Sequence, residues 1–300
     1  MKAIRFADYG GPEVLTLGEV DEPHAGKGQI RIKVRTAAVN PSDYKLHSGL
    51  MKAFRPIDLP SGLGAEAAGI VDEVGEGVTG VSVGDAVFGK GFHTFAEYAL
   101  LYAWSRKPES MSFEEAAATG SSVEAAVRYL DLVGLKPGQT LLVSGAAGGV
   151  GSALVQLARL RGLKVIGTAT EGKHDYLRSL GATPTTYGDG LIDRVKALAP
   201  DGVDAAIDVV GSGVIDDLIA ITGDATKVAT TVISQVRDGV LSSFKESEQP
   251  AVAMTEAAHA FEEGKFRMRV DSTFPLADAG SATALSAGKH TTGKIVIVVD

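Results

Sequence analysis

The chain has 300 residues, more than one hydrophobic core usually organises, so we expect two domains. The formal net charge is −8 with no basic stripe, which argues against nucleic acid as a partner. Cysteine is absent, which excludes disulfides and every zinc site built on thiolates. No segment approaches the roughly 18–20 apolar residues of a membrane span, and the N-terminus lacks the apolar core of a signal peptide. We therefore expect a cytoplasmic protein with no membrane partner.

Residues 1–100 read as a series of short strands separated by glycine-containing turns. The clearest strand-like run extends from Ile30 to Val39. Residues 67–74 are apolar and β-branched, and residues 81–88 alternate around a turn. This spacing is typical of a barrel or an irregular sandwich.

The pattern changes near residue 112. Ser112 and Glu115 have the spacing of a capping box, and residues 123–132 have helical character, with Ser121 and Ser122 as expected caps. Strand-like and helix-like segments then alternate over residues 139–144, 150–161, 164–168, 174–180, 191–198 and 203–210. Such alternation predicts a parallel sheet covered by helices. After about residue 265 the pattern returns to strands, ending at 294–299, so we expect the last segment to rejoin the first domain.

The strongest local signal is a glycine-rich turn between the strand at 139–144 and the helix that follows it. Small residues there let the backbone approach a pyrophosphate, and the helix N-terminus supplies free N–H groups. The expected contacts are Gly145, Ala147, Gly148, Gly149, Val150 and Gly151. The alternative is a glycine-rich turn in an α/β domain that binds nothing.

The second strand of this unit distinguishes between the two nicotinamide cofactors. An NAD site usually places an acidic residue about 20 residues after the glycines, for the ribose 2′-hydroxyl. Here the strand ends in Thr168-Ala169-Thr170, with Lys173 close behind. Hydroxyls and a cation suit a 2′-phosphate, so we predict NADPH, with Thr170 and Lys173 at that phosphate and Tyr187 as a weaker candidate. Thr168 is a further expected cofactor-binding residue. Glu171 is the adverse feature, and Lys173 could instead be a solvated residue at a helix start.

Eight blocks of sequence, taken in order, are similar to those of one known family. They are Asn40–Tyr44, Gly64–Val71, Val81–Val87, Phe95–Tyr98, Gly134–Gly138, Gly145–Gly151, Asp204–Asp208 and His290–Val296. The chain resembles quinone oxidoreductase-like members of the medium-chain dehydrogenase/reductase superfamily, and the resemblance covers nearly all of it. It implies an α/β protein with a GroES-like β-rich catalytic domain (1–118 and 265–300) and a Rossmann domain with a doubly wound parallel sheet (119–264).

The resemblance also implies an activity. Zinc-dependent relatives hold their metal where this chain has Asn40 and Gly64-Ala65-Glu66, and their structural zinc needs four cysteines, so we expect no metal. Without that Lewis acid, hydride acceptors such as quinones and α,β-unsaturated carbonyls remain accessible. The expected function is NADPH-dependent reduction of such a small molecule, with the cofactor in the cleft between the domains.

Site residues are assigned by the same resemblance. Asn40, Asp43 and Tyr44 are the expected catalytic residues, and Asn40 also contacts the nicotinamide end. Tyr44 could donate to a carbonyl oxygen or simply form a pocket wall. Lys294 could approach the cofactor or be a surface lysine at a strand end. Glu124 stands where relatives often have threonine near the nicotinamide ribose; it could contact cofactor or substrate, or face solvent.

Three other functions stay open. An enoyl reductase of a biosynthetic pathway would share fold and cofactor, and a largely non-catalytic NADPH-binding protein would share the cofactor site. RNA binding is the least compatible with an acidic chain. We expect a homodimer formed through an edge strand at Thr226–Ile233.

Overall fold

A computed structural model describes residues 1–243, 247 and 249–299. The chain folds into two compact units, Met1–Ser121 with Gln249–Asp300 (unit 1) and Ser122–Glu248 (unit 2). Helix α2 (Phe113–Val133) contains the first boundary. The second boundary lies earlier than the sequence pattern suggested, because helix α7 (Pro250–Glu262) packs on strand β7 of unit 1.

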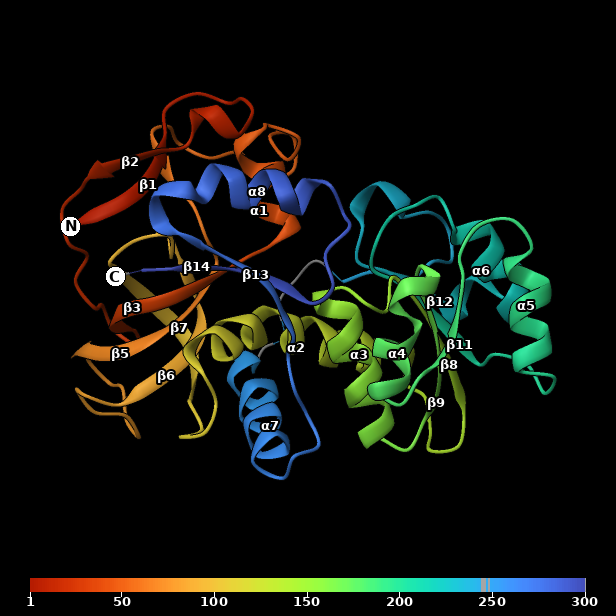
Figure 1. Cartoon of the computed structure of the whole chain (residues 1–300). Helices are drawn as coiled ribbons and strands as arrows, with labels where there is room; N and C mark the ends of the chain where they lie inside the picture. Colours follow the sequence, from red (N-terminus) through yellow and green to blue (C-terminus); the bar gives the residue numbers. More distant parts are fainter. Residues whose placement is uncertain (244–246, 248, 300) are drawn as a thin grey trace. The chain divides into compact units, whose positions relative to one another are not determined.

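Unit 1 is built around a six-stranded sheet in the order β13-β14-β3-β5-β6-β7, with a further pairing between β3 and β7 that curls the sheet toward a barrel. Figure 1 shows β14, from the end of the chain, beside β3 from its beginning, and the two pair antiparallel. The strands are β3 (Ile30–Val39), β5 (Glu66–Val74), β6 (Ala86–Phe92), β7 (Tyr98–Arg106), β13 (Val270–Pro275) and β14 (Lys294–Val298). The last segment therefore joins the first, as the sequence indicated.

Smaller elements complete unit 1. A three-stranded sheet has the order β2-β1-β4. Its strands and the remaining helical segments are β1 (Lys2–Phe6), β2 (Thr16–Glu19), β4 (Ser61–Gly62), η1 (Pro12–Val14), α1 (Pro41–His47), η5 (Leu276–Asp278) and α8 (Ala279–Ala287). The core is formed by side chains that point inward from alternate strand positions, including Ile30, Ile32 and Val34 of β3. Helix α8 was not expected, because its sequence of Ala, Gly, Ser and Thr carries no clear apolar stripe.

Unit 2 is a five-stranded sheet in the order β10-β9-β8-β11-β12, with every pair parallel. Numbered within the unit this is 3-2-1-4-5, the order of a dinucleotide-binding fold. The strands are β8 (Thr140–Ser144), β9 (Lys164–Thr168), β10 (Thr183–Thr185), β11 (Ala205–Asp208) and β12 (Val228–Thr230). The helical segments are α3 (Gly149–Leu160), η2 (Glu171–Lys173), α4 (His174–Ser179), α5 (Leu191–Leu198), α6 (Ile215–Thr222), η3 (Ala225–Lys227) and η4 (Ile233–Gln235).

One sequence expectation, at the boundary of the two units, needs correction. Ser121 and Ser122 do not cap a helix, because α2 begins earlier, where the backbone N–H of Glu115 donates to Ser112 Oγ at 3.1 Å, and continues through both serines.

The edge strand β12 of unit 2 is partly covered, because Leu241 exchanges backbone hydrogen bonds with Val228 and Thr230. Pairing with a second chain at those groups would have to displace Leu241. Among the described residues, no helix is long and apolar enough to cross a membrane.

Candidate functional site

Three polar side chains meet inside unit 1 because their strands are neighbours. Asn40 directly follows β3, Glu66 is the first residue of β5, and Lys294 is the first residue of β14. Strand β3 pairs with both β5 and β14, with Val39 opposite Ile295 and Ala37 opposite Ala67. Antiparallel pairing thus places the end of β3 beside the starts of the other two strands.

These side chains form a closed hydrogen-bonded cluster. Lys294 Nζ lies 2.7 Å from Glu66 Oε1 and 2.6 Å from Asn40 Oδ1, and Asn40 Nδ2 donates to Glu66 Oε1 at 2.8 Å. Glu66 Oε2 accepts the backbone N–H of Ser121 at 2.6 Å. Glu66 and Lys294 are buried, with 0% and 5% of their surfaces exposed. Their opposite charges compensate each other, and both ends of the Asn40 amide are held in a fixed orientation.

Asp43 and Tyr44, on helix α1, lie next to this cluster in sequence. Asp43 Oδ2 accepts the backbone N–H of Asn40 at 2.7 Å. Burial raises the pKa of Asp43 from 3.8 to about 7, although the Asn40 hydrogen bond and the positive charge of Lys294 oppose the rise. Burial also raises the pKa of Tyr44, so its phenol stays protonated at neutral pH. Unit 1 therefore offers a fixed amide, a carboxyl group that titrates near neutrality and a half-buried phenol.

The structure changes the interpretation of Lys294. It is not a surface lysine at a strand end, because its ammonium is buried against Glu66. Glu66 itself was absent from the predicted site residues. The sequence shows Glu66 within a Gly-Ala-Glu segment, but it gives no sign that the partner stands 228 positions away.

The glycine-rich turn of unit 2 is tightly packed at two of its glycines and open at a third. Gly145 has φ +82°, and a Cβ built on it would lie 2.0 Å from Val210 Cγ2. A Cβ on Gly151 would lie 2.1 Å from the carbonyl oxygen of Gly145, so glycine there lets helix α3 pack tightly on the turn. Gly148 is different: the nearest atom to an added Cβ is 3.7 Å away. The N-terminus of α3 follows directly at Gly149, and its first N–H groups lack helical acceptors.

The residues expected near a 2′-phosphate follow two adjacent parallel strands. Thr185, the last residue of β10, pairs with Thr168, the last residue of β9. Thr170 and Lys173 follow the carboxyl end of β9, and Tyr187 follows the carboxyl end of β10, so all three lie at the same end of the parallel sheet. The surface of Tyr187 is 54% exposed. Thr168 itself is buried, and its hydroxyl accepts the backbone N–H of Gly145 at 3.1 Å. That hydroxyl holds the end of β9 to the glycine-rich turn.

Glu124 does not face solvent. Its carboxylate is buried, with Oε1 2.9 Å from Arg128 Nε and 3.0 Å from the backbone N of Ser247. Arg128 in turn donates to the carbonyl oxygen of Ser243. The pair thus ties helix α2 to residues 243 and 247 of the same unit.

Ser122, two residues before Glu124, is a buried polar residue outside the predicted site residues. Its side chain is 1% exposed, and Oγ has no hydrogen-bond partner among the described residues. A buried hydroxyl without a partner costs free energy unless a ligand satisfies it, so Ser122 is a candidate ligand contact. The residue type alone gave no such signal, because serine is also common at helix caps.

The donor set of unit 1 does not suit zinc. Where the resemblance places a metal in zinc-dependent relatives, this chain has an amide (Asn40) and a carboxylate (Glu66) with an ammonium group (Lys294) between them. The ammonium already neutralises the carboxylate and would repel a cation.

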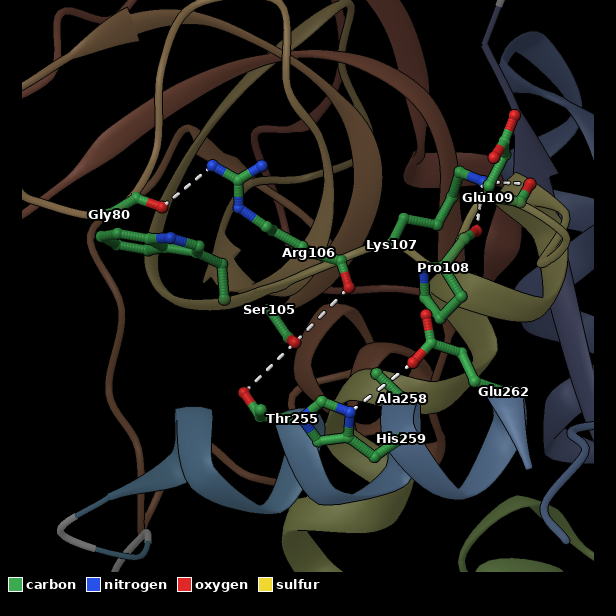
Figure 2. A pocket seen from close by; sticks show the side chains of 11 residues that line it. Gly80, Ser105, Arg106, Lys107, Pro108, Glu109, Thr255, Ala258, His259 and Glu262 are labelled. Atoms are coloured by element: carbon green, nitrogen blue, oxygen red, sulfur yellow. Dashed lines mark hydrogen bonds and ion pairs between the residues drawn. The ribbon is translucent and has the colours of Figure 1, made fainter.

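Figure 2 shows a separate pocket of unit 1, between β7 and α7. Thr255 Oγ1 donates to Ser105 Oγ at 3.2 Å, and His259 lies beside Glu262 on the exposed face of α7. The lining includes none of the predicted site residues. Most of its charged groups (Arg106, Glu109, His259 and Glu262) are exposed, and Lys107 Nζ donates to backbone carbonyl oxygens, so we place the candidate site elsewhere.

Two protein-family models match this chain, one in its first half and one in its second half. Residues 26–121 match the family model of the alcohol dehydrogenase GroES-like domain, and residues 180–297 match that of the zinc-binding dehydrogenase. Quinone oxidoreductase of Rattus norvegicus is 33% identical over 332 positions, covering 100% of this chain and 98% of the relative. The 2-methylene-furan-3-one reductase of Solanum lycopersicum is 38% identical over 231 positions, covering 71% of this chain and 58% of the relative's length.

Solved structures of similar proteins superpose on nearly the whole chain. Quinone oxidoreductase from Coxiella burnetii superposes with a TM-score of 0.87 at 30% identity, covering 100% of this chain and 99% of the other. A mycobacterial protein complexed with NADPH has a TM-score of 0.88 at 28% identity, with 99% and 100% coverage. An NAD-dependent alcohol dehydrogenase has the same TM-score and identity, with 100% coverage of both chains. The chain therefore belongs to the quinone oxidoreductase-like branch of the medium-chain dehydrogenase/reductase superfamily, a family of oxidoreductases.

Proposed function

We propose that this protein transfers a hydride from NADPH to a quinone or an α,β-unsaturated carbonyl compound without a metal ion. The observation that carries the proposal is the buried Lys294–Glu66 pair, which replaces a metal-binding donor set with a neutralised, fixed hydrogen-bonding cluster. Two relatives support the acceptor class, one named for a quinone and one for a methylene-furanone.

The residues of unit 2 fit the cofactor. The turn from Gly145 to Gly151 and the N-terminus of α3 would hold the pyrophosphate, with Ala147, Gly148, Gly149 and Val150 lining it. Thr170, Lys173 and Tyr187 would bind the 2′-phosphate, whose charge Lys173 complements. The carboxylate of Glu171 opposes that charge, so hydroxyl donors are needed beside the lysine. Bound NADPH supplies the hydride itself.

The residues of unit 1 would orient the acceptor. Asn40, fixed at both ends of its amide, would contact the nicotinamide end, and Lys294 would act through Asn40. The protonated phenol of Tyr44 would donate to a carbonyl oxygen of the substrate, and Asp43 would supply or take a proton near neutral pH. Such hydrogen bonds stabilise an oxygen that gains charge when hydride adds to a conjugated carbon.

The test is NADPH and NADH oxidation over quinones, enones, enals and acyl thioesters, with alcohols in the reverse direction, each with and without a chelator. We expect chelator-insensitive, NADPH-preferring turnover of quinones or enones. Lys173→Met should reduce the NADPH preference, while Lys136→Met, on an exposed turn, should not. Chelator-sensitive alcohol oxidation would overturn the proposal, and tight NADPH binding without any turnover would favour a non-catalytic binder.

A homodimer stays a prediction for this protein. Leu241 already pairs with the outer edge of β12, so a dimer through Thr226–Ile233 would use side chains or require Leu241 to move. Light scattering coupled to size-exclusion chromatography measures the mass directly and would show one or two copies of the 31.0 kDa chain.

A further inference from the structure

One arginine of unit 2 binds the backbone of the loop that carries Tyr187. Arg194, on helix α5, donates from Nη1 to the carbonyl oxygen of Asp189 at 2.7 Å. Its Nη2 lies 3.1, 3.4 and 3.2 Å from the carbonyl oxygens of Thr186, Tyr187 and Gly188. A single guanidinium thus donates hydrogen bonds to four successive carbonyl oxygens, which requires a planar group with several donors.

The loop benefits from this support because its backbone is exposed and turns sharply. Gly188 and Gly190 both have positive φ, +83° and +76°, and residues 187–190 are exposed. Backbone hydrogen bonds from Leu191 to Gly188 and from Arg194 to Gly190 join the end of the loop to helix α5. Four carbonyl groups that turn toward one point repel each other unless a cation lies among them.

The loop that Arg194 binds lies beside the residues expected to bind the cofactor 2′-phosphate. Strand β10 ends at Thr185 beside the carboxyl end of β9, so the loop starts at the end of the sheet where Thr170 and Lys173 follow β9. Tyr187 presents a largely exposed ring there, and two carboxylates, Glu171 and Asp189, lie in the same segments. A phosphate at this edge is bound only if its hydroxyl and cationic partners are held in a defined arrangement.

We propose that Arg194 is a specificity-determining positioning residue, which fixes Tyr187 for the cofactor 2′-phosphate and so sets the preference for NADPH over NADH. The inference rests on the proposed function, because it takes Tyr187 to be a phosphate contact. Arg194 acts through the shape of the loop, so its charge alone does not suffice.

The experiment compares dissociation constants for NADPH and NADH, and for the fragments 2′,5′-ADP and 5′-ADP, by calorimetry on the intact chain. Arg194→Met removes both the positive charge and the planar guanidinium donors. Arg194→Lys keeps the charge, but a single ammonium group cannot donate to all four carbonyl oxygens. The matched control is Arg161→Met, at the far end of α3, which loses an exposed ion pair with Asp131. We expect both Arg194 variants to weaken NADPH and 2′,5′-ADP by about tenfold, with NADH and 5′-ADP changed less than about twofold.

A double-mutant cycle with Tyr187→Phe tests whether Arg194 acts through the tyrosine. The Tyr187→Phe effect on NADPH binding should largely disappear in the Arg194→Lys background. Amide hydrogen exchange at Leu191 should also accelerate in Arg194→Lys, because the loop opens more often.

The outcomes separate the inference from the function on which it rests. A wild-type preference for NADPH that survives Arg194→Lys overturns the inference alone, as do equal losses for both nucleotides or independent effects in the cycle. A wild-type protein that prefers NADH overturns the cofactor assignment and, with it, this role of Arg194.

Discussion

Lys294 and Glu66 form a buried ion pair, with Nζ 2.7 Å from Oε1, although 228 positions separate them in the chain. Each charge is tolerable inside unit 1 only because the other is there. Lys294→Met should therefore lower the free energy of unfolding by about 3–5 kcal/mol, since it leaves a buried carboxylate uncompensated. Urea denaturation followed by circular dichroism measures the change.

The control for this pair is the double variant Glu66→Gln with Lys294→Met. It contains neither charge, so it should be more stable than Lys294→Met alone. Equal stability of the single and double variants would show that the pair does not carry the effect.

Asp43 should make stability depend on pH. Its pKa is about 7 in the folded protein against an ordinary value of 3.8, so the native state binds more protons between these two values. Its contribution is fully present below pH 3.8 and falls as the pH rises through about 7, with a slope of at most about 1.4 kcal/mol per pH unit. Asp43→Asn should flatten this part of the stability profile, measured by urea midpoints from pH 5 to 8. The exposed Asp8→Asn should leave the slope unchanged, and a slope that persists in Asp43→Asn would contradict the assignment.

Two glycines of the turn should respond differently to alanine. Gly151→Ala places a Cβ 2.1 Å from a backbone oxygen, so both thermal stability and NADPH affinity should fall. Gly148→Ala meets nothing closer than 3.7 Å, so the melting temperature should stay within about 2 °C while NADPH binding weakens, because the methyl group occupies space beside the pyrophosphate. Calorimetric unfolding and nucleotide titration on both variants give the two quantities. If Gly148→Ala binds NADPH like the wild type, the pyrophosphate does not lie on this turn.

Glu124 should contribute to stability through Arg128. Glu124→Gln should cost about 1–3 kcal/mol in the free energy of unfolding, because the largely buried guanidinium loses its charged acceptor. Asp131→Asn is the matched control on the same helix: its pair with Arg161 is exposed, so its effect should be within about 0.5 kcal/mol. Comparable effects of the two substitutions would mean that Glu124 is not a buried partner in solution.

Local sequence predicted the regular elements well where one periodicity dominated. Strands β3 and β9 and helix α5 have the predicted bounds, because each is a single run of apolar residues at strand or helix spacing between clear turn residues. Helices α1 and α8 were not predicted. The first is short and begins at a proline after a strand, and the second has small residues on all faces, so packing rather than pattern defines both.

The sequence by itself determined the class of fold, the glycine-rich turn and the absence of thiolate ligands, because these depend on residue type and near-neighbour spacing. The tertiary structure decided which charges meet. The Lys294–Glu66–Asn40 cluster needs strands from both ends of the chain in register, Glu124 needed the distant segment at 243 and 247, and Arg194 needed a loop folded around it. Hydrogen bonds and ion pairs act over a few ångströms, so their partners are set by three-dimensional proximity, which linear spacing does not reveal.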